Sequence, residues 1–159
     1  MISRKARYAL KAVVALAKAE PGHVVLIGDI AEHENIPKKF LEQILLDLKH
    51  QGIVTSKRGK GGGYLLLKKP EQITFGEVLR IIDGPIALLP CLSRMAYSRC
   101  DDCNDEGTCE IRRVFARVAD ATRNVLDRTT VADNTSHDWE NEIPIRVASS
   151  NGISRLVQN

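Results

Sequence analysis

The sequence predicts a mainly helical protein with one small β-hairpin: a winged helix-turn-helix domain followed by a long C-terminal helix. Three observations support this fold class. Two short amphipathic segments flank a brief turn near residues 35–36, a basic glycine-rich stretch separates two β-prone segments within 53–67, and apolar residues repeat at three- and four-residue steps over 110–128. With 159 residues, 43% of them apolar, the chain can bury one modest core and is short for two independent domains.

The first helix follows Ser3, a suitable N-cap, and stops before Pro21-Gly22. Its apolar residues recur at helical spacing: Ala6, Ala9, Leu10, Val13, Val14 and Ala17. After the β-prone residues 24–26, a two-turn helix is expected over 27–34, ending near Asn35, with Ile27, Ile30 and Ala31 inward.

The next helix is expected from Pro37, which suits a first helical turn, to the stop at Gln51-Gly52. Its predicted buried stripe is Phe40, Leu41, Ile44, Leu45 and Leu48. Two helices joined by so short a turn form a helix-turn-helix unit, whose second helix can enter a DNA major groove.

A β-hairpin, or wing, is predicted next, with strands over 53–56 and 64–67 and a turn over 57–63. Its glycines permit positive φ and close approach to a phosphate, and Lys57, Arg58 and Lys60 supply cations. Residues 1–84 therefore form the expected winged helix-turn-helix domain, ending with a helix that opens in a capping box of Thr74 and Glu77 and stops at Gly84-Pro85.

The remainder of the chain divides into a cysteine-rich loop over 85–109, a helix over 110–130 and a polar tail over 131–159 that is expected to be flexible. The helix carries an a/d seam made of Ile111, Val114, Val118, Ala121 and Val125. This seam fits pairing with a second chain, because a small winged domain leaves a terminal helix little to pack against; packing on the protein's own core is the alternative.

Charge and cysteine usage indicate the class of partner and the compartment. Residues 1–89 hold 14 Lys/Arg against 9 Asp/Glu, and residues 90–159 hold 9 against 11, so the first half is the candidate polyanion-binding half. No apolar stretch is long enough for a membrane span or a signal peptide, so we expect a cytoplasmic protein. In that reducing compartment, four cysteines within nineteen residues favour metal binding or redox chemistry over structural disulfides.

The chain resembles the Rrf2 family of bacterial transcriptional regulators, the kind that includes IscR, NsrR and RirA. The resemblance covers roughly residues 1–130 and is strongest at Arg7-Tyr8-Ala9, at Phe40-Leu41-Glu42-Gln43 and at the wing, Arg58-Gly59-Lys60-Gly61-Gly62-Gly63-Tyr64. It implies a homodimer on a palindromic DNA operator, with each recognition helix in the major groove. It also implies that Arg58 reads the minor groove and that Lys39, Phe40 and Gln43 occupy contact positions.

Physical reasoning gives similar roles. A glutamine such as Gln43 can make a bidentate contact to adenine, Glu42 can accept from a cytosine amino group, and an arginine fits a narrow, negative minor groove. Lysines at 38, 39 and 57 are expected on phosphates, which makes binding salt-dependent without conferring sequence preference. The alternative for each charged residue is a solvated surface side chain, and for Phe40 a place in the core.

The resemblance further implies that Cys91, Cys103 and Cys109 are cluster ligands. Arg112 and Arg7 occupy positions where some members carry a histidine or an aspartate ligand, so Cys100 is the candidate fourth ligand. Four thiolates suit an iron–sulfur cluster, 2Fe-2S or 4Fe-4S, and also zinc, which we consider less favoured; reversibly oxidised thiols are a further alternative.

No enzymatic activity or small-molecule substrate is expected. Cys100-Asp101-Asp102-Cys103 has oxidoreductase spacing, but two carboxylates would raise the thiol pKa. The four histidines, His23, His33, His50 and His137, fall in no nucleophile motif. The predicted function is a dimeric, sequence-specific regulator, a repressor, that senses iron–sulfur, iron, redox or nitric oxide status. Alternatives are a zinc-stabilised or thiol-switch repressor without a cluster and a regulator that acts by protein–protein docking.

Overall fold

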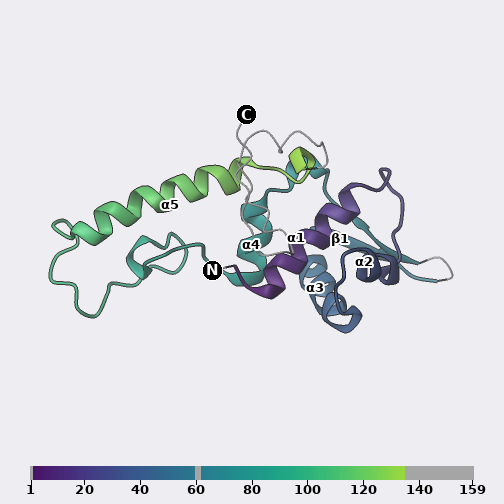
Figure 1. Ribbon diagram of the computed structural model, residues 1–159, viewed down its shortest axis with the longest axis horizontal. Helices are drawn as coiled ribbons and strands as arrows, with labels where there is room; N and C mark the ends of the chain where they lie inside the picture. The colour runs from purple at the N-terminus through teal and green to yellow at the C-terminus, as the bar shows by residue number, and fades with distance from the viewer. Residues whose placement is uncertain (1, 60–61, 135–159) are drawn as a thin grey trace, which may run out of the picture.

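The computed structural model describes residues 2–59 and 62–134 (Figure 1). The elements in chain order are α1 (Arg4–Ala17), α2 (Ile27–His33), α3 (Lys38–His50), β1 (Val54–Lys57), β2 (Gly63–Leu66), η1 (Pro70–Gln72), α4 (Phe75–Asp83), η2 (Pro90–Leu92), α5 (Glu110–Arg128) and η3 (Ala132–Asn134). The two strands pair antiparallel, with Val54 opposite Leu66 and Lys57 opposite Gly63. The mainly helical fold with one hairpin is therefore confirmed.

The core lies where α1, α3 and α4 pack together, with α2 against α3. The Ser3 hydroxyl caps α1 by accepting from the Ala6 amide at 2.9 Å, and Thr74 caps α4 through the Glu77 amide at 3.0 Å. The Glu77 carboxylate does not complete a capping box, because it binds Lys68 Nζ at 2.6 Å instead. The largest fully buried side chains come from several elements: Val13, Ile30, Leu41, Ile44, Leu45, Leu48, Ile53, Val54, Ile73, Val78 and Val131.

The hairpin is fastened to the domain at its base. Val25 and Tyr64 exchange two backbone hydrogen bonds of 2.9 Å, so the β-prone stretch before α2 forms a single bridge rather than a strand. A side chain at Gly63 would collide with the Val25 carbonyl, which explains the glycine at this crossing. The backbone bridge between Val25 and Tyr64 therefore fixes the direction in which the wing leaves the domain.

The loop of residues 85–109 runs out from the winged domain, and α5 beside it carries the chain back (Figure 1). η2 of this loop packs on α5. The chain then re-enters the domain: the Val131 amide donates to the Ile73 carbonyl at 2.8 Å, and the Val131 side chain is fully buried. Val131 is the first residue of the expected tail, and residues 135–159 lie outside the described part of the chain.

No described helix is both long enough and apolar enough to span a lipid bilayer.

Candidate nucleic-acid interface and cysteine site

Helix α3 separates a buried face from an exposed one. Leu41, Ile44, Leu45 and Leu48 are fully buried, whereas Lys38, Lys39, Glu42 and Gln43 are exposed. The exposed set is therefore available to a ligand along one side of the helix.

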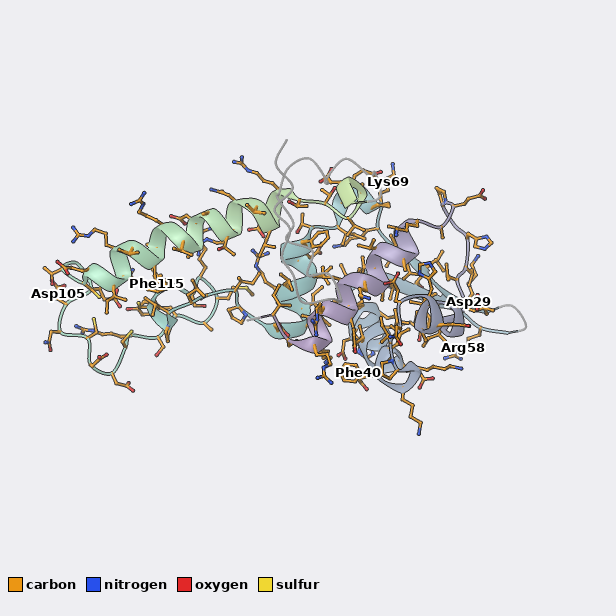
Figure 2. All side chains as sticks on the ribbon, in the orientation of Figure 1. Asp29, Phe40, Arg58, Lys69, Asp105 and Phe115 are labelled. Carbon is orange, nitrogen blue, oxygen red and sulfur yellow. The ribbon has the colours of Figure 1, made fainter. Side chains whose placement is uncertain are left out.

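Phe40 was expected in the buried stripe, and that expectation is wrong: its side chain is 39% exposed. Its ring meets Tyr8 of α1 edge to face, with centroids 5.8 Å apart, and Tyr8 is itself only partly buried, so Phe40 packs at the edge of the core. Figure 2 shows Phe40 at the start of α3, on the outside of the domain. The aromatic pair supports the first turn of α3 and leaves part of the Phe40 ring accessible.

The first turn of α3 carries two lysines and no acidic residue. This arrangement opposes the helix dipole, which favours negative charge at a helix N-terminus. Within the described part of the chain, Lys38 and Lys39 have neither an ion pair nor a hydrogen-bonded partner. Lysines without a counter-charge at this position could bind a polyanion such as the DNA backbone.

The wing presents Lys57 and Arg58 to solvent, next to a sharp turn. Gly59 has a φ of 103°, which an L side chain rarely adopts, and its carbonyl accepts from the Gly62 amide at 2.9 Å. Lys49 Nζ donates to Ser56 Oγ at 2.7 Å and so joins the end of α3 to strand β1. Lys60, the remaining predicted contact, lies outside the described residues.

Two residues that the sequence analysis did not single out complete this surface. Asp47, one turn after Gln43 on α3, accepts from Gln43 Nε2 at 3.0 Å and forms an ion pair of 2.7 Å with Lys5 of α1. The hydrogen bond from Lys5, aided by the one from Gln43, holds the pKa of Asp47 below its ordinary value, although partial burial opposes this. Asp47 is therefore a carboxylate at neutral pH.

The cysteine loop lies at the opposite end of the molecule. Figure 2 places Asp105 and Phe115 there, far from Arg58 and Phe40. Cys91 sits in η2 and is 5% exposed, while Cys100, Cys103 and Cys109 are partly exposed. The cysteine loop and the candidate nucleic-acid surface thus lie at opposite ends of the molecule (Figure 2).

Some of the four thiols lie close together: Cys100 is near Cys91 and Cys103. Partial burial, a hydrogen bond with Cys91 and the nearby charges of Asp102 and Cys103 raise the pKa of Cys100. Cys109 instead caps α5, its sulfur accepting from the Arg112 amide at 3.4 Å. Among the described residues, no three cysteine, histidine or carboxylate side chains converge closely enough to hold a metal ion.

Arg112 links this loop to α5. Its guanidinium donates to the Cys91 carbonyl and lies 3.6 Å from Glu106, which in turn accepts from the Tyr97 hydroxyl at 2.6 Å. The Asp105 carboxylate accepts hydrogen bonds from the Gly107 amide and the Thr108 hydroxyl, both at 3.0 Å. Side-chain hydrogen bonds and ion pairs therefore order a long loop with little regular structure, and Arg112 connects that loop to α5.

The predicted seam of α5 is uncovered in the single chain. Ile111, Val114, Val118 and Val125 are 43–64% exposed. Beside the C-terminal half of α5 lies an apolar groove of about 700 Å³ between α4, the segment after it and α5. Its lining includes Leu79, Ile86, Leu88, Ala121 and Val125. The alternative in which the seam packs on the protein's own core does not fit this exposure.

Comparisons with known proteins agree with these features. Residues 2–136 match the family model Rrf2, described as an iron-dependent transcriptional regulator. An rrf2-like HTH-type transcriptional regulator of Rhodobacter capsulatus is 49% identical over 136 residues, which cover 84% of this chain and 91% of that protein. The structure of CymR, the global cysteine regulator of Bacillus subtilis, superposes with a TM-score of 0.73 at 33% identity and covers 86% of this chain and 97% of CymR. T. potens IscR superposes with a TM-score of 0.68 at 26% identity, covering 91% and 93%.

Proposed function

Because the chain belongs to the Rrf2 family of DNA-binding transcriptional regulators, we propose that it acts as a homodimeric repressor on a palindromic operator. The observation that supports this most directly is the exposed face of α3 and the wing, where Lys38, Lys39, Lys57 and Arg58 have no partner within the described residues. Pairing through the α5 seam would place two recognition helices on one duplex. A regulator of this kind works on the chromosome, so we also propose a cytoplasmic location and no enzymatic role.

The operator contacts divide by chemistry. Gln43 and Glu42 would read base edges in the major groove, and Arg58 the minor groove; the lysines would neutralise phosphates. Phe40 adds apolar contact, because part of its ring is accessible.

Arg58→Ala tests the proposal. Operator affinity is expected to fall about 5- to 150-fold, together with sequence preference, since one good base contact is worth ~1–3 kcal/mol. The measurement is a binding titration on an operator selected from random duplexes, at several salt concentrations. Lys57→Ala is the matched neighbour: it should weaken binding to all sequences and reduce the salt slope by about one, with preference retained. If Arg58→Ala kept the sequence preference of the wild type, the proposal that the wing recognises the DNA sequence would be wrong.

For sensing, we propose that Cys91, Cys100, Cys103 and Cys109 hold an iron–sulfur cluster. The donor chemistry fits, since all four are soft thiol ligands on one loop at the start of α5. A bound cluster would supply redox- and nitric-oxide-sensitive chemistry, and the chain's own contribution is the hydrogen bond from Arg112 to Cys91, which connects the loop to the helix of the dimer seam.

A second candidate is a thiol switch or a structural zinc site. Of these two, the thiol switch is favoured by the pairwise contact of Cys91 with Cys100, because a zinc site also needs further ligands and no third described ligand converges there. Similarity to CymR, named a global cysteine regulator, points the same way.

Elemental analysis separates these candidates. Protein purified without oxygen is expected to contain iron and acid-labile sulfide near stoichiometry, with charge-transfer absorption, and Cys103→Ser should lose most of both. Ser98→Ala, an exposed change in the same loop, serves as the control and should retain them. Zinc in place of iron, or no metal, would support the second candidate, and full metal content in Cys103→Ser would show that the ligand set is wrong.

A further inference from the structure

Gln43 does not project freely from the recognition surface. Its amide nitrogen donates to one oxygen of Asp47 at 3.0 Å, while the other oxygen of Asp47 binds Lys5 Nζ at 2.7 Å. The two partners of Asp47 lie on different elements, Gln43 one turn earlier on α3 and Lys5 on α1. A three-residue chain of polar contacts therefore crosses from α1 to the outer face of α3.

The chemistry of Asp47 determines which way the Gln43 amide points. A carboxylate only accepts hydrogen bonds, so the NH₂ group of the amide, and not its oxygen, must face it. Asp47 is ionised at neutral pH, and the 2.7 Å contact with Lys5 fixes the position of its carboxylate and lowers its pKa further. One N–H of Gln43 is consumed, and the other N–H and the carbonyl oxygen Oε1 remain for an external partner.

That remaining pair matches one base edge. A bidentate contact to adenine uses one amide N–H on N7 and the amide oxygen on the N6 amino group, whereas guanine offers two acceptors in the same place, N7 and O6. With its second N–H held by Asp47, Gln43 has a single donor to offer and is matched to adenine.

We propose that Asp47, held by Lys5, is a positioning residue that sets the orientation of Gln43 and thereby favours adenine over guanine at the base pair that Gln43 meets. The inference rests on the proposed operator binding. Because Gln43 is partly immobilised before DNA arrives, it also loses less side-chain entropy on binding.

Asp47 also joins α1 to α3, so a loss of affinity by itself would not distinguish positioning from support of the fold. Base preference does distinguish them, since weaker packing lowers binding to every sequence alike. The discriminating variant is Asp47→Asn, nearly the same shape but able to donate as well as accept, which lets the Gln43 amide rotate and present both N–H groups to guanine.

The experiment compares full-length wild type and Asp47→Asn on the wild-type operator, selected from random duplexes, and on operators with each base pair changed singly. The preference for adenine over guanine at one base pair in each half-site is expected to fall about 5- to 10-fold, the value of roughly one hydrogen bond, with the other positions unaffected. Lys5→Gln should act in the same direction and more weakly. Lys11→Ala, which breaks the 3.5 Å pair of α1 with Glu34, is the matched control and should leave the profile unchanged.

A double-mutant cycle completes the test. Asp47→Asn should have no further effect on base preference in a Gln43→Ala background, because the side chain that it orients is missing. An unchanged base profile, or a loss spread evenly over all positions, would overturn the positioning role while leaving operator binding intact. Absence of any sequence preference in the wild type would instead overturn the proposed function.

Discussion

Replacing Leu45 with alanine is expected to lower the free energy of unfolding by about 2–5 kcal/mol. Leu45 is fully buried in the middle of α3, where truncation removes apolar contact and leaves a cavity that the packed helices cannot close. Chemical denaturation followed by circular dichroism gives the value.

The next residue supplies the control. Leu46 is 40% exposed on the same helix, so Leu46→Ala makes the same chemical change outside the core and should cost less than about 0.5 kcal/mol. Equal losses in the two variants would contradict the assignment of the buried face of α3, and with it the exposure of Gln43 and Glu42.

Val118→Asp is expected to convert the dimer to a monomer and to reduce operator affinity more than about 100-fold. Val118 is 43% exposed in the single chain, so a carboxylate there costs the monomer little. In a paired seam the same carboxylate would lie unpaired among apolar side chains, at a cost of several kcal/mol. Sedimentation analysis of the free protein and a titration of operator DNA measure the two effects.

Asn124→Asp introduces the same charge on α5 outside the seam, at another exposed position, and should remain dimeric. Circular dichroism would show that both variants keep their helices. A Val118→Asp protein that still sediments as a dimer would place the subunit contact elsewhere, with the apolar groove beside α4 as the next surface to test.

Helices with a cap, a periodic apolar stripe and a stop could be predicted from sequence almost to their ends. The predicted stop at Gln51-Gly52 and the observed end of α3 at His50 agree, and the Ser3 cap holds the start of α1. Local signals suffice there because the bonds that end a helix join near neighbours in the chain. The same holds for the wing, whose strands begin and end within one residue of expectation.

Contacts between distant residues were not predictable in this way. Gln43 and Asp47 stand four residues apart on one helix, a spacing at which side chains meet. The contact between them could therefore have been predicted from the sequence. The contact between Asp47 and Lys5 could not, because Lys5 lies on a helix more than thirty residues earlier. Burial of Val131 likewise depends on where the chain returns after α5, and periodicity ends before that point.

Helix α5 is attached to the rest of the chain at both ends, so a tilt of the helix changes the position of one end relative to the other. At its C-terminal end, Arg80 binds Asp127 at 2.5 Å, the Phe75 amide donates to the Thr129 carbonyl at 3.1 Å, and Val131 enters the core. At the other end it meets the cysteine loop. A helix of 19 residues is about 28 Å long, so each degree of tilt about its C-terminal end moves its N-terminal end by about 0.5 Å. Under the proposed sensing role, a shift of a few ångströms at the cysteine loop would turn the winged domain by several degrees, provided that α5 stays straight.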